Sequence, residues 1–408
     1  MVLSIPMVLL LIALALSPLY LWSSGLPQVS HLIGALAIIW RLLFRPKFCC
    51  GKWWRLGAVF VCYAFTVGLI VFAIYGDIHT LLSPVYYAFG FAVFLLIVTL
   101  ARERQAFLLW IFGIHFVALF LLTVFSVLGV GRSFGMGRFM FTFNDPNQMA
   151  NWVIWAAIIV GSTGRAIFGN WLPGLFALFL ATTDIVFSAS RSGALGLGVL
   201  VVVYGLMAIS WFIRVLRGRA SLKVRRWTVF AFCALIALVI VGCLGMEKGG
   251  SDVLVNQVRF LLNRFWERDP DDTLEGRGYD RIWKFPEYLF LGAGEGAHER
   301  YASRTWFLGE IHSSWAGLLF NYGIVGFCLF FAFLYFLLRE VRFFWFKAMF
   351  LSPFIYGFAT YNIRNWYFWV GIAVLYASGQ VVVKNNFLLK GRVTGAHGKD
   401  FQVGGNPS

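Results

Sequence analysis

Residues 1–22 read MVLSIPMVLLLIALALSPLYLW, an apolar run that contains no charged side chain. Its length matches the roughly 17–25 apolar residues that a helix needs to cross the hydrocarbon core of a bilayer. No basic segment precedes the run and no small-residue cleavage site follows it, so we expect a retained first span and not a cleaved signal peptide. This stretch therefore indicates an integral membrane protein.

The rest of the chain has the same character. Of its 408 residues, 60% are hydrophobic and 13% are charged, whereas a soluble chain carries about 25% charged residues. The apolar runs predict about twelve membrane-spanning helices in an all-α polytopic fold. The runs are centred near Ile12, Leu36, Thr66, Phe91, Ala118, Ala157, Ala177, Val202, Ile236, Leu329, Phe350 and Ile372.

The formal net charge of +16 follows the topology of the spans. If the N-terminus is cytoplasmic, the even-numbered connections and the C-terminal tail face the cytoplasm. Together they hold most of the basic residues, and the tail contributes Lys384, Lys390, Arg392 and Lys399. This distribution is the positive-inside pattern of membrane proteins, so the positive charge does not point to nucleic acid. The basic residues of the even-numbered connections are Arg41, Arg45, Lys47, Lys52, Arg55, Arg102, Arg104, Arg165, Arg214, Arg217, Arg219, Lys223, Arg225, Arg226, Arg339, Arg342 and Lys347.

These patterns divide the chain into four parts. Nine spans are expected over residues 1–245, a large outer loop over 246–312, three spans over 313–383, and a disordered cytoplasmic tail over 384–408. The loop contains EGRGYDRIWKFPEYLFLGAGEGAHERYASRTWFLGEIH at residues 275–312. Its earlier part is expected to form an amphipathic helix whose apolar face runs from Val255 to Phe265. Six scattered cysteines show neither a disulfide framework nor zinc-type spacing.

The outer connections carry few charges, yet several of those are arginines that run against the charge trend. Arg132 and Arg138 follow the fifth span, Arg191 precedes the eighth, and Arg364 lies between the last two. For Arg364 we favour the interpretation of a membrane anchor that reaches toward lipid phosphate. Arg191 stands among serines at the start of a glycine-containing helix, where free N–H groups attract anions, so it is a candidate seat for a diphosphate.

The sequence NDPNQ at residues 144–148 supports two interpretations. Asp145 followed by proline is a helix-start signal, with the acidic side chain as the cap. Asn144, Asp145 and Asn147 would also suit hydrogen bonding to sugar hydroxyls. Both interpretations stay open at this point.

Glycines and basic residues gather in the large loop. The run GAGEG at residues 292–296, which includes Glu295, neither follows a nucleotide-fold strand nor opens a βαβ unit, so we expect a tight loop that substrate can approach. Arg277 and Arg281 would lie one helical turn apart, so both could face a single anion.

The loop also holds His298 and His312. Because His312 lies beside the tenth span, two residues after Glu310, we favour a catalytic role for it as a base or hydrogen-bond partner. Structural and functional interpretations of His298 remain balanced.

Several enzyme classes are excluded by their missing motifs. The chain has no HExxH, GxSxG, Walker or protein-kinase signature. Asp184 is the clearest ionisable residue within a span, and a proton-coupled transporter normally needs more. Transfer chemistry at the outer face therefore fits better than transport, although a transporter of lipid-linked glycans, with the loop as a lid, remains an alternative. No metal and no cofactor is expected.

Four motifs occur in the order found in a known family. RFMFTFNDPNQMANW, SASRSGALGLG, RGYDRIW…PEYLFLGAGEGA and EIHSSW…LLFNYGIVG resemble those of the O-antigen ligase and O-antigen/exopolysaccharide polymerase superfamily, from about Arg132 to Gly326. The resemblance implies a type C glycosyltransferase of the bacterial inner membrane, with both termini in the cytoplasm and the active site, including loop 246–312, on the periplasmic side.

The resemblance also implies the reaction and its partners. Members transfer glycan from undecaprenyl diphosphate to an acceptor hydroxyl, with inversion and without metal. The acceptor is a lipid-linked repeat unit in the polymerase, with a chain-length regulator as a further partner, and lipid A–core in the lipopolysaccharide ligase. We favour the polymerase because of the GAGEG…EIHSSW subtype.

The residues can be assigned roles within that scheme. Arginine binds phosphate through a planar, permanently charged fork. The donor diphosphate would be held by Arg191 with Arg277, Arg281, Arg132 and Arg138, and Arg191 would also act in catalysis.

The remaining candidates concern the acceptor and the sugars. Either His312 or Glu310 would take the acceptor proton. Asn144, Asp145, Asn147, Glu295 and His298 would bind the sugar or acceptor.

Overall fold

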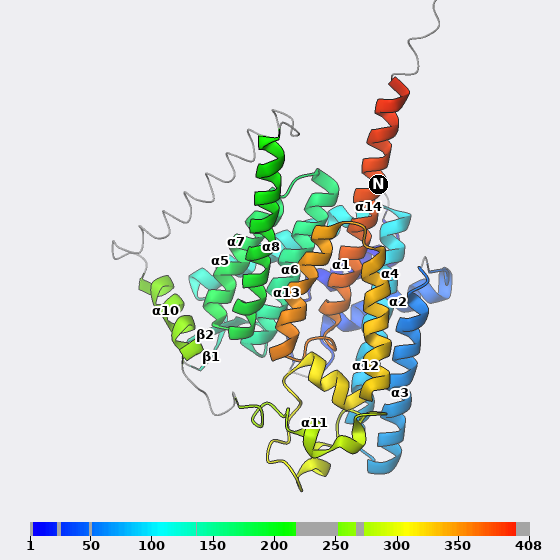
Figure 1. Ribbon diagram of the computed structural model, residues 1–408, viewed down its shortest axis with the longest axis vertical. Coiled ribbons are helices and arrows are strands. Elements are labelled where there is room, and N and C mark those ends of the chain that lie inside the picture. Colours follow the sequence, from blue (N-terminus) through cyan, green and yellow to red (C-terminus); the bar gives the residue numbers. More distant parts are fainter. Residues whose placement is uncertain are drawn as a thin grey trace, which may run out of the picture.

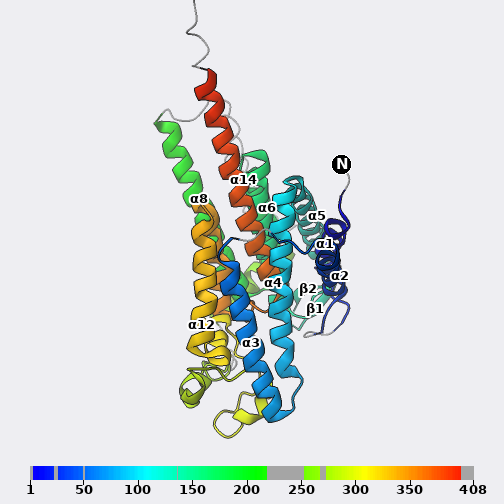
Figure 2. The ribbon, with the colours of Figure 1, turned by 90° about the vertical axis from the view of Figure 1, so that its right-hand side faces the viewer.

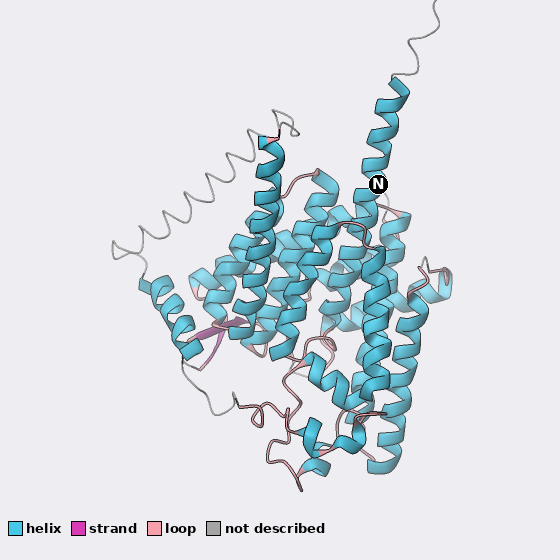
Figure 3. Cartoon of the chain, in the orientation of Figure 1, coloured by secondary structure: helices cyan, strands magenta, loops and turns pink. Residues whose placement is uncertain are grey.

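The computed structural model describes residues 3–22, 26–48, 51–135, 137–217, 252–266 and 273–396, and within them it is a bundle of helices (Figures 1 and 3). The helices are α1 (Ile5–Ala15), α2 (Val29–Phe44), α3 (Trp54–Tyr75), α4 (His79–Glu103), α5 (Ala106–Leu128), α6 (Pro146–Phe168), α7 (Leu172–Ser188), α8 (Arg191–Leu216), α10 (Asp252–Trp266), α11 (Arg281–Lys284), α12 (Ser314–Glu340), α13 (Phe344–Ala359) and α14 (Trp366–Ala396). Two antiparallel strands, β1 (Arg132–Phe134) and β2 (Arg138–Phe141), form a hairpin after α5.

The prediction of a mostly helical polytopic membrane protein is confirmed. Six of the described helices are long and apolar enough to cross a membrane, namely α3, α4, α5, α6, α8 and α12, and α1, α2, α7 and part of α14 are shorter apolar helices. Eleven of the twelve predicted centres fall within described helices, and the ninth, near Ile236, lies outside the described residues. The expected total of twelve spans stays a prediction, and the β1–β2 hairpin is an addition to the all-α fold.

Helix α6 lies at the centre of the bundle and packs against α5, α7, α8, α13 and α14. It begins where the sequence predicts, because the Asp145 carboxylate accepts a hydrogen bond from the Asn147 N–H at 2.6 Å and Pro146 occupies the first turn. Its contact with α7 is close, since a Cβ on Gly174 would lie 2.9 Å from the Cα of Gly161. Small residues thus allow the two backbones to meet. The short helices α1 and α2 pack on one side of the bundle, against α5 and α4 (Figure 2).

Helix α12 is interrupted at Gly323, where φ is +61° and ψ is −176°. The glycine run before α12 enters this break. Ala293 and Gly294 donate their N–H groups to the carbonyls of Phe320 and Asn321, at 2.9 and 2.7 Å. On the other side of the break, the Ile324 N–H donates to the Leu289 carbonyl at 2.8 Å. The loop therefore satisfies backbone groups that the interrupted helix leaves unpaired.

The odd-numbered connections meet at one end of the bundle, the lower end in Figure 1. There, the hydroxyl of Tyr356 near the end of α13 donates to the carbonyl of Asn147 in α6 at 2.5 Å. The Ala297 N–H of the loop before α12 donates to Asp77, between α3 and α4, at 2.7 Å. The assignment of this end to the periplasm stays a prediction.

At the opposite end, α14 runs through the expected boundary at residue 383 and ends at Ala396, and residues 397–408 lie outside the description.

Candidate active site

A buried carboxylate organises one half of the site. The Glu295 side chain is 5% exposed. Its Oε1 accepts hydrogen bonds from the hydroxyls of Tyr361 at 2.7 Å, Tyr322 at 3.0 Å and Tyr87 at 3.3 Å. Its Oε2 accepts from Ser83 and from the Arg364 guanidinium, the latter at 3.0 Å. Glu295 is thus a buried charge that is paired and fully hydrogen-bonded, as burial of a charge requires.

Arg364 joins Glu295 to a second carboxylate. Its Nη1 and Nη2 atoms donate to the two oxygens of Glu310 at 2.7 and 2.8 Å, which is the bidentate geometry of a strong ion pair. Partial burial acts to raise the pKa of Glu310, but Arg364 outweighs it and holds that pKa below its usual value. Burial likewise acts to lower the pKa of Arg364, and the two carboxylates raise it well above its usual value. Both partners of the pair therefore carry full charge.

These residues line a cavity of about 920 Å³. Its wall combines carboxylates, cations and aromatic rings, which together suit the hydroxyls and the apolar faces of sugars. We call this cavity the carboxylate pocket, and it is lined by, among others, Asp77, Tyr86, Glu295, His298, Glu310 and Arg364.

His298 is held neutral beside this pocket. Burial, helped by the neighbouring Arg281, lowers the pKa of His298 to about 4. Arg281 itself is 1% exposed, and its guanidinium donates to the carbonyls of Phe307 and Gly309 at 2.7 and 2.6 Å. Arg281 therefore fixes the segment that carries Glu310.

Three arginines gather at the other half of the site, where α8 begins. The Arg138 Nε donates to the Ser188 carbonyl at 3.4 Å, the Arg191 Nη1 to the Arg264 carbonyl at 3.0 Å, and the Arg264 Nη1 to the Ala189 carbonyl at 2.7 Å. Burial together with the charges of Arg264 and Arg191 lowers the pKa of Arg138 to about 10. We call Arg138, Arg191 and Arg264 the arginine cluster, and its mutual repulsion would be relieved by a bound anion.

The start of α8 contributes polar groups next to the arginine cluster. Ser190 caps the helix, since its Oγ accepts from the Gly193 N–H at 3.1 Å and donates to the Asn147 Oδ1 at 2.7 Å. Asn147, at the start of α6, thus lies within the same polar group of side chains. A helix N-terminus with arginines beside it matches the chemistry of a phosphate-binding site.

One short segment joins the two halves. Thr360, after α13, donates from its Oγ1 to the Ser192 Oγ at 3.2 Å and so lies beside the start of α8. The next residue, Tyr361, bonds Glu295, and Arg364 follows three positions later. The turn 360–364 therefore places the arginine cluster and the carboxylate pocket next to each other.

His312 is linked through Arg277 to the residue that precedes this joining turn. Its backbone N–H donates to the Arg277 carbonyl at 3.0 Å, and the Arg277 guanidinium donates to the Ala359 carbonyl at 3.3 Å. The His312 ring is exposed and lies 5.5 Å from the Phe307 ring, centre to centre. His312 thus bonds Arg277 through its backbone and follows Glu310 of the carboxylate pocket by two residues.

The other candidate residues lie outside the two halves of the site or form hydrogen bonds with backbone groups. Arg132 is exposed and donates to the carbonyls of Thr142 and Tyr20, and Asn144 donates to the Trp22 carbonyl at 2.8 Å. Arg277 and Arg281 do not lie one helical turn apart, because α11 begins only at Arg281, and their guanidinium groups bond different carbonyls. Asp145 acts as the helix cap described above.

Sequence reasoning did not identify several members of the site. Arg264 belongs to the amphipathic helix α10. The sequence offered no indication of its role beyond its being a basic residue on the polar face of that helix. Arg364 was interpreted as a lipid anchor, whereas its side chain is 25% exposed and bonds two carboxylates. The hydroxyls of Tyr87 and Tyr322 come from two spanning helices, and no sequence spacing relates them to Glu295.

A comparison with known families gives a match. Residues 176–331 match a family model described as O-Antigen ligase, which places this segment in the O-antigen ligase and polymerase superfamily, as the motifs predict. No curated protein matches the chain.

The matched segment begins in α7 and ends within α12, so it contains Arg191, the loop and His312. The match supports a membrane-embedded protein with glycosyltransferase-like activity, for which lipid-linked glycans and glycan acceptors are the general class of substrate.

Proposed function

We propose that this protein transfers a glycan from a polyprenyl diphosphate, undecaprenyl diphosphate in bacteria, to an acceptor sugar hydroxyl on the periplasmic side of the inner membrane. The proposal is supported above all by the adjacency of the arginine cluster and the carboxylate pocket across the turn 360–364. A diphosphate-linked sugar needs both chemistries at once, because one end of the bond that breaks is an anion and the other is a polyol.

In the proposed reaction, the acceptor hydroxyl oxygen attacks the anomeric carbon of the donor sugar while the bond to the diphosphate oxygen breaks. The hydroxyl proton passes to a base, and the electron pair of the broken bond leaves with the diphosphate. Attack opposite the leaving group inverts the anomeric centre. The donor already carries the energy of the reaction, so neither ATP nor a metal ion enters the proposed step.

The arginine cluster is the proposed donor site. Arg191 and Arg138 would stabilise the charge that develops on the leaving diphosphate, and Arg264 would complete the cluster. Arg277 would orient the neighbouring turn, and Arg281 the segment before Glu310. Arg132 and Asn144 lie at the hairpin end and would contact only the outer part of the donor.

His312 is the proposed base. Glu310 is the weaker candidate, because Arg364 holds its carboxylate ionised and occupies both of its oxygens. Glu310 would instead orient the acceptor together with Glu295 and His298. Asp145 and Asn147, near the arginine cluster, would contact the donor sugar.

Turnover by the purified full-length protein tests the proposal. The protein would be placed in nanodiscs with an undecaprenyl diphosphate-linked oligosaccharide, without any ion gradient, and released undecaprenyl diphosphate would be measured. Arg191→Ala is expected to lower turnover about 100- to 1,000-fold, and His312→Ala about 100-fold or more. Arg45→Ala, which removes an exposed cation next to the end of α2, is the matched control and should retain full activity.

Two outcomes would contradict the proposal. Full turnover by correctly inserted Arg191→Ala protein would remove the diphosphate role of the arginine cluster. Movement of the donor between leaflets without bond cleavage would identify a transporter of lipid-linked glycans.

The acceptor distinguishes the two reactions of the superfamily. We propose the repeat-unit polymerase first, from the GAGEG…EIHSSW subtype, and the family match described as O-Antigen ligase favours the ligase as the second candidate. With donor alone, a polymerase produces a ladder of longer lipid-linked chains and a ligase does not. With lipid A–core added, only a ligase consumes it.

A further inference from the structure

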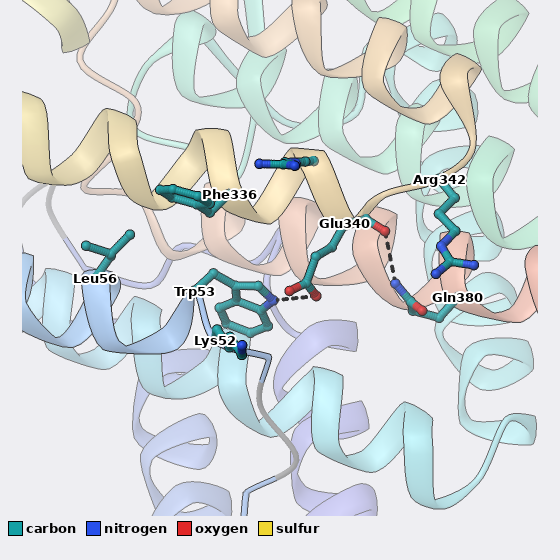
Figure 4. A pocket seen from close by; sticks show the side chains of 8 residues that line it. Lys52, Trp53, Leu56, Phe336, Glu340, Arg342 and Gln380 are labelled. Carbon is teal, nitrogen blue, oxygen red and sulfur yellow. Dashed lines mark hydrogen bonds between the residues drawn. The ribbon is translucent and has the colours of Figure 1, made fainter.

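A second polar cavity lies at the far end of α12 from the candidate active site. It has a volume of about 640 Å³ and lies between the start of α3, the end of α12 and the middle of α14 (Figure 4). Three exposed cations line it, together with apolar and aromatic side chains, one carboxylate and one amide. We call it the basic cavity, and its lining includes Lys52, Trp53, Leu56, Phe336, Arg339 and Arg342.

One carboxylate also lines the basic cavity, but neutral groups hold it. Glu340 Oε2 accepts from the Trp53 Nε1 at 3.1 Å and from the Tyr376 hydroxyl at 2.9 Å. The Glu340 backbone carbonyl accepts from Gln380 at 3.2 Å, as Figure 4 shows. Within the described ranges, no ion pair joins Glu340 to any of the three cations of the cavity.

Lys52, Arg339 and Arg342 therefore keep their charge available to a ligand. Where the chain is described, they form no ion pair with any carboxylate. Three cations around one cavity create a positive potential that favours an anion of about the size of a phosphate group. Arginine and lysine are the side chains by which proteins bind such groups.

The apolar part of the cavity wall favours a lipid phosphate over free phosphate as the ligand. Leu56 and Phe336 belong to α3 and α12, two helices long enough to span a membrane, and Phe336 is 44% exposed. Leu56 follows Lys52 by about one helical turn, and Phe336 precedes Arg339 by about one turn, so each apolar side chain lies next to a cation. A ligand with a phosphate at the level of the cations and a hydrocarbon chain along Phe336 satisfies both parts of the cavity. Free phosphate would satisfy only the cations.

We propose that the basic cavity binds the phosphate head of an anionic phospholipid, with an acyl chain against Leu56 and Phe336. This site is separate from the arginine cluster and the carboxylate pocket, and it does not depend on the proposed transfer reaction. Binding here would fix the ends of α3, α12 and α14 relative to the membrane surface.

Lipid titration of the delipidated full-length protein tests the proposal. Native mass spectrometry in detergent would measure the tightest lipid-binding event with phosphatidylglycerol, with phosphatidylcholine, and with inorganic phosphate. We expect phosphatidylglycerol to bind tightest. Binding should weaken about fivefold for each cation removed, hence roughly 25-fold in Arg339→Gln/Arg342→Gln.

Two further variants separate this site from general effects. Arg45→Gln/Lys47→Gln removes the same charge from the connection between α2 and α3 and should bind phosphatidylglycerol as the unaltered protein does. Arg339→Lys/Arg342→Lys keeps the charge and should retain binding to within a few-fold, which also checks that these positions tolerate replacement. The proposal is overturned if the Gln double variant binds as tightly as the unaltered protein. It is also overturned if the control loses as much, or if phosphatidylcholine or inorganic phosphate binds equally well.

Discussion

Arg364 and Glu310 are joined by two parallel hydrogen bonds of 2.7 and 2.8 Å, although they lie on different segments of the chain. The same guanidinium also bonds the buried Glu295 at 3.0 Å. One cation in the turn between α13 and α14 thus joins two separate positions of the polar loop that precedes α12. Arg364 therefore fixes the two carboxylates of the carboxylate pocket relative to each other.

Replacement of Arg364 should therefore reduce both stability and activity. Arg364→Ala leaves the Glu295 carboxylate buried without its cation, and loss of one partner of such a pair costs about 3–5 kcal/mol of unfolding free energy. Thermal unfolding in detergent would measure the loss, and the turnover assay should show little activity.

A second substitution separates the effect of the unpaired Glu295 charge from the effect of losing the Arg364 side chain. Arg364→Ala/Glu295→Gln removes the unpaired charge and should recover much of the stability without recovering turnover. Equal instability of the single and double variants would contradict the electrostatic explanation.

The arginines near α8 should differ in importance according to where they lie. Arg264→Ala removes a member of the arginine cluster and should lower turnover at least 10-fold, by weakening the stabilisation of the leaving diphosphate. Arg132→Ala, on the exposed side of the hairpin, should have a much smaller effect. Initial rates over a range of donor concentrations would separate binding from turnover. The order of importance is wrong if Arg132→Ala proves the more damaging change.

Gly323 should be irreplaceable because of its backbone conformation. Its φ of +61° with ψ of −176° is accessible only to glycine, and a Cβ would lie 2.7 Å from the Gly292 nitrogen. Strain and steric overlap together predict that Gly323→Ala lowers the unfolding free energy by more than about 3 kcal/mol. Thermal unfolding and expression in the membrane would report the loss.

Gly198 in α8 offers the matched control for Gly323. Apart from its chain neighbours and the backbone of α8 itself, nothing lies within 4 Å of a Cβ placed there, so Gly198→Ala should be neutral or stabilise the helix by up to about 1 kcal/mol. Similar losses for both variants would point to a general intolerance of helix substitutions.

His298 should make stability depend on pH. Burial lowers its pKa to about 4 in the folded protein, against about 6.5 when unfolded. Between these values the unfolded chain binds a proton that the folded chain does not, so His298 makes the protein less stable as pH falls from 6.5 to 4. His298→Gln removes this proton uptake, so the melting temperature of the variant should fall less than that of the unaltered protein between pH 6.5 and 4. Parallel melting curves across this range would contradict the assignment.

The spans could be predicted because the bilayer imposes a simple rule on them. Each crossing needs a long apolar run, and eleven predicted centres fall within described helices. The cap at Asp145 and the start of α8 at Arg191 were equally readable, because helix ends depend on local residues. The grouping of Arg138 with Arg191 follows from topology, since both lie in odd-numbered connections.

The carboxylate pocket could not be read in the same way. Ser83, Tyr87 and Tyr322 belong to apolar spans. Their hydroxyls can be identified as site residues only once helix packing has brought them within hydrogen-bond distance of Glu295. Arg364 looked like an anchor because its partners lie 69 and 54 residues away in the chain. Such contacts depend on tertiary structure, for which one sequence gives no spacing rule.

The insertion of residues 289–294 into the break of α12 limits how the protein can open. These residues supply hydrogen bonds that the interrupted helix needs at membrane depth, so the glycine run behaves as part of the spanning bundle. A swinging movement of this part of the loop would leave carbonyls of Phe320 and Asn321 unpaired. We therefore expect the wall that carries Glu295 to stay in place, so that any opening movement in the proposed transfer reaction would involve other segments of the site.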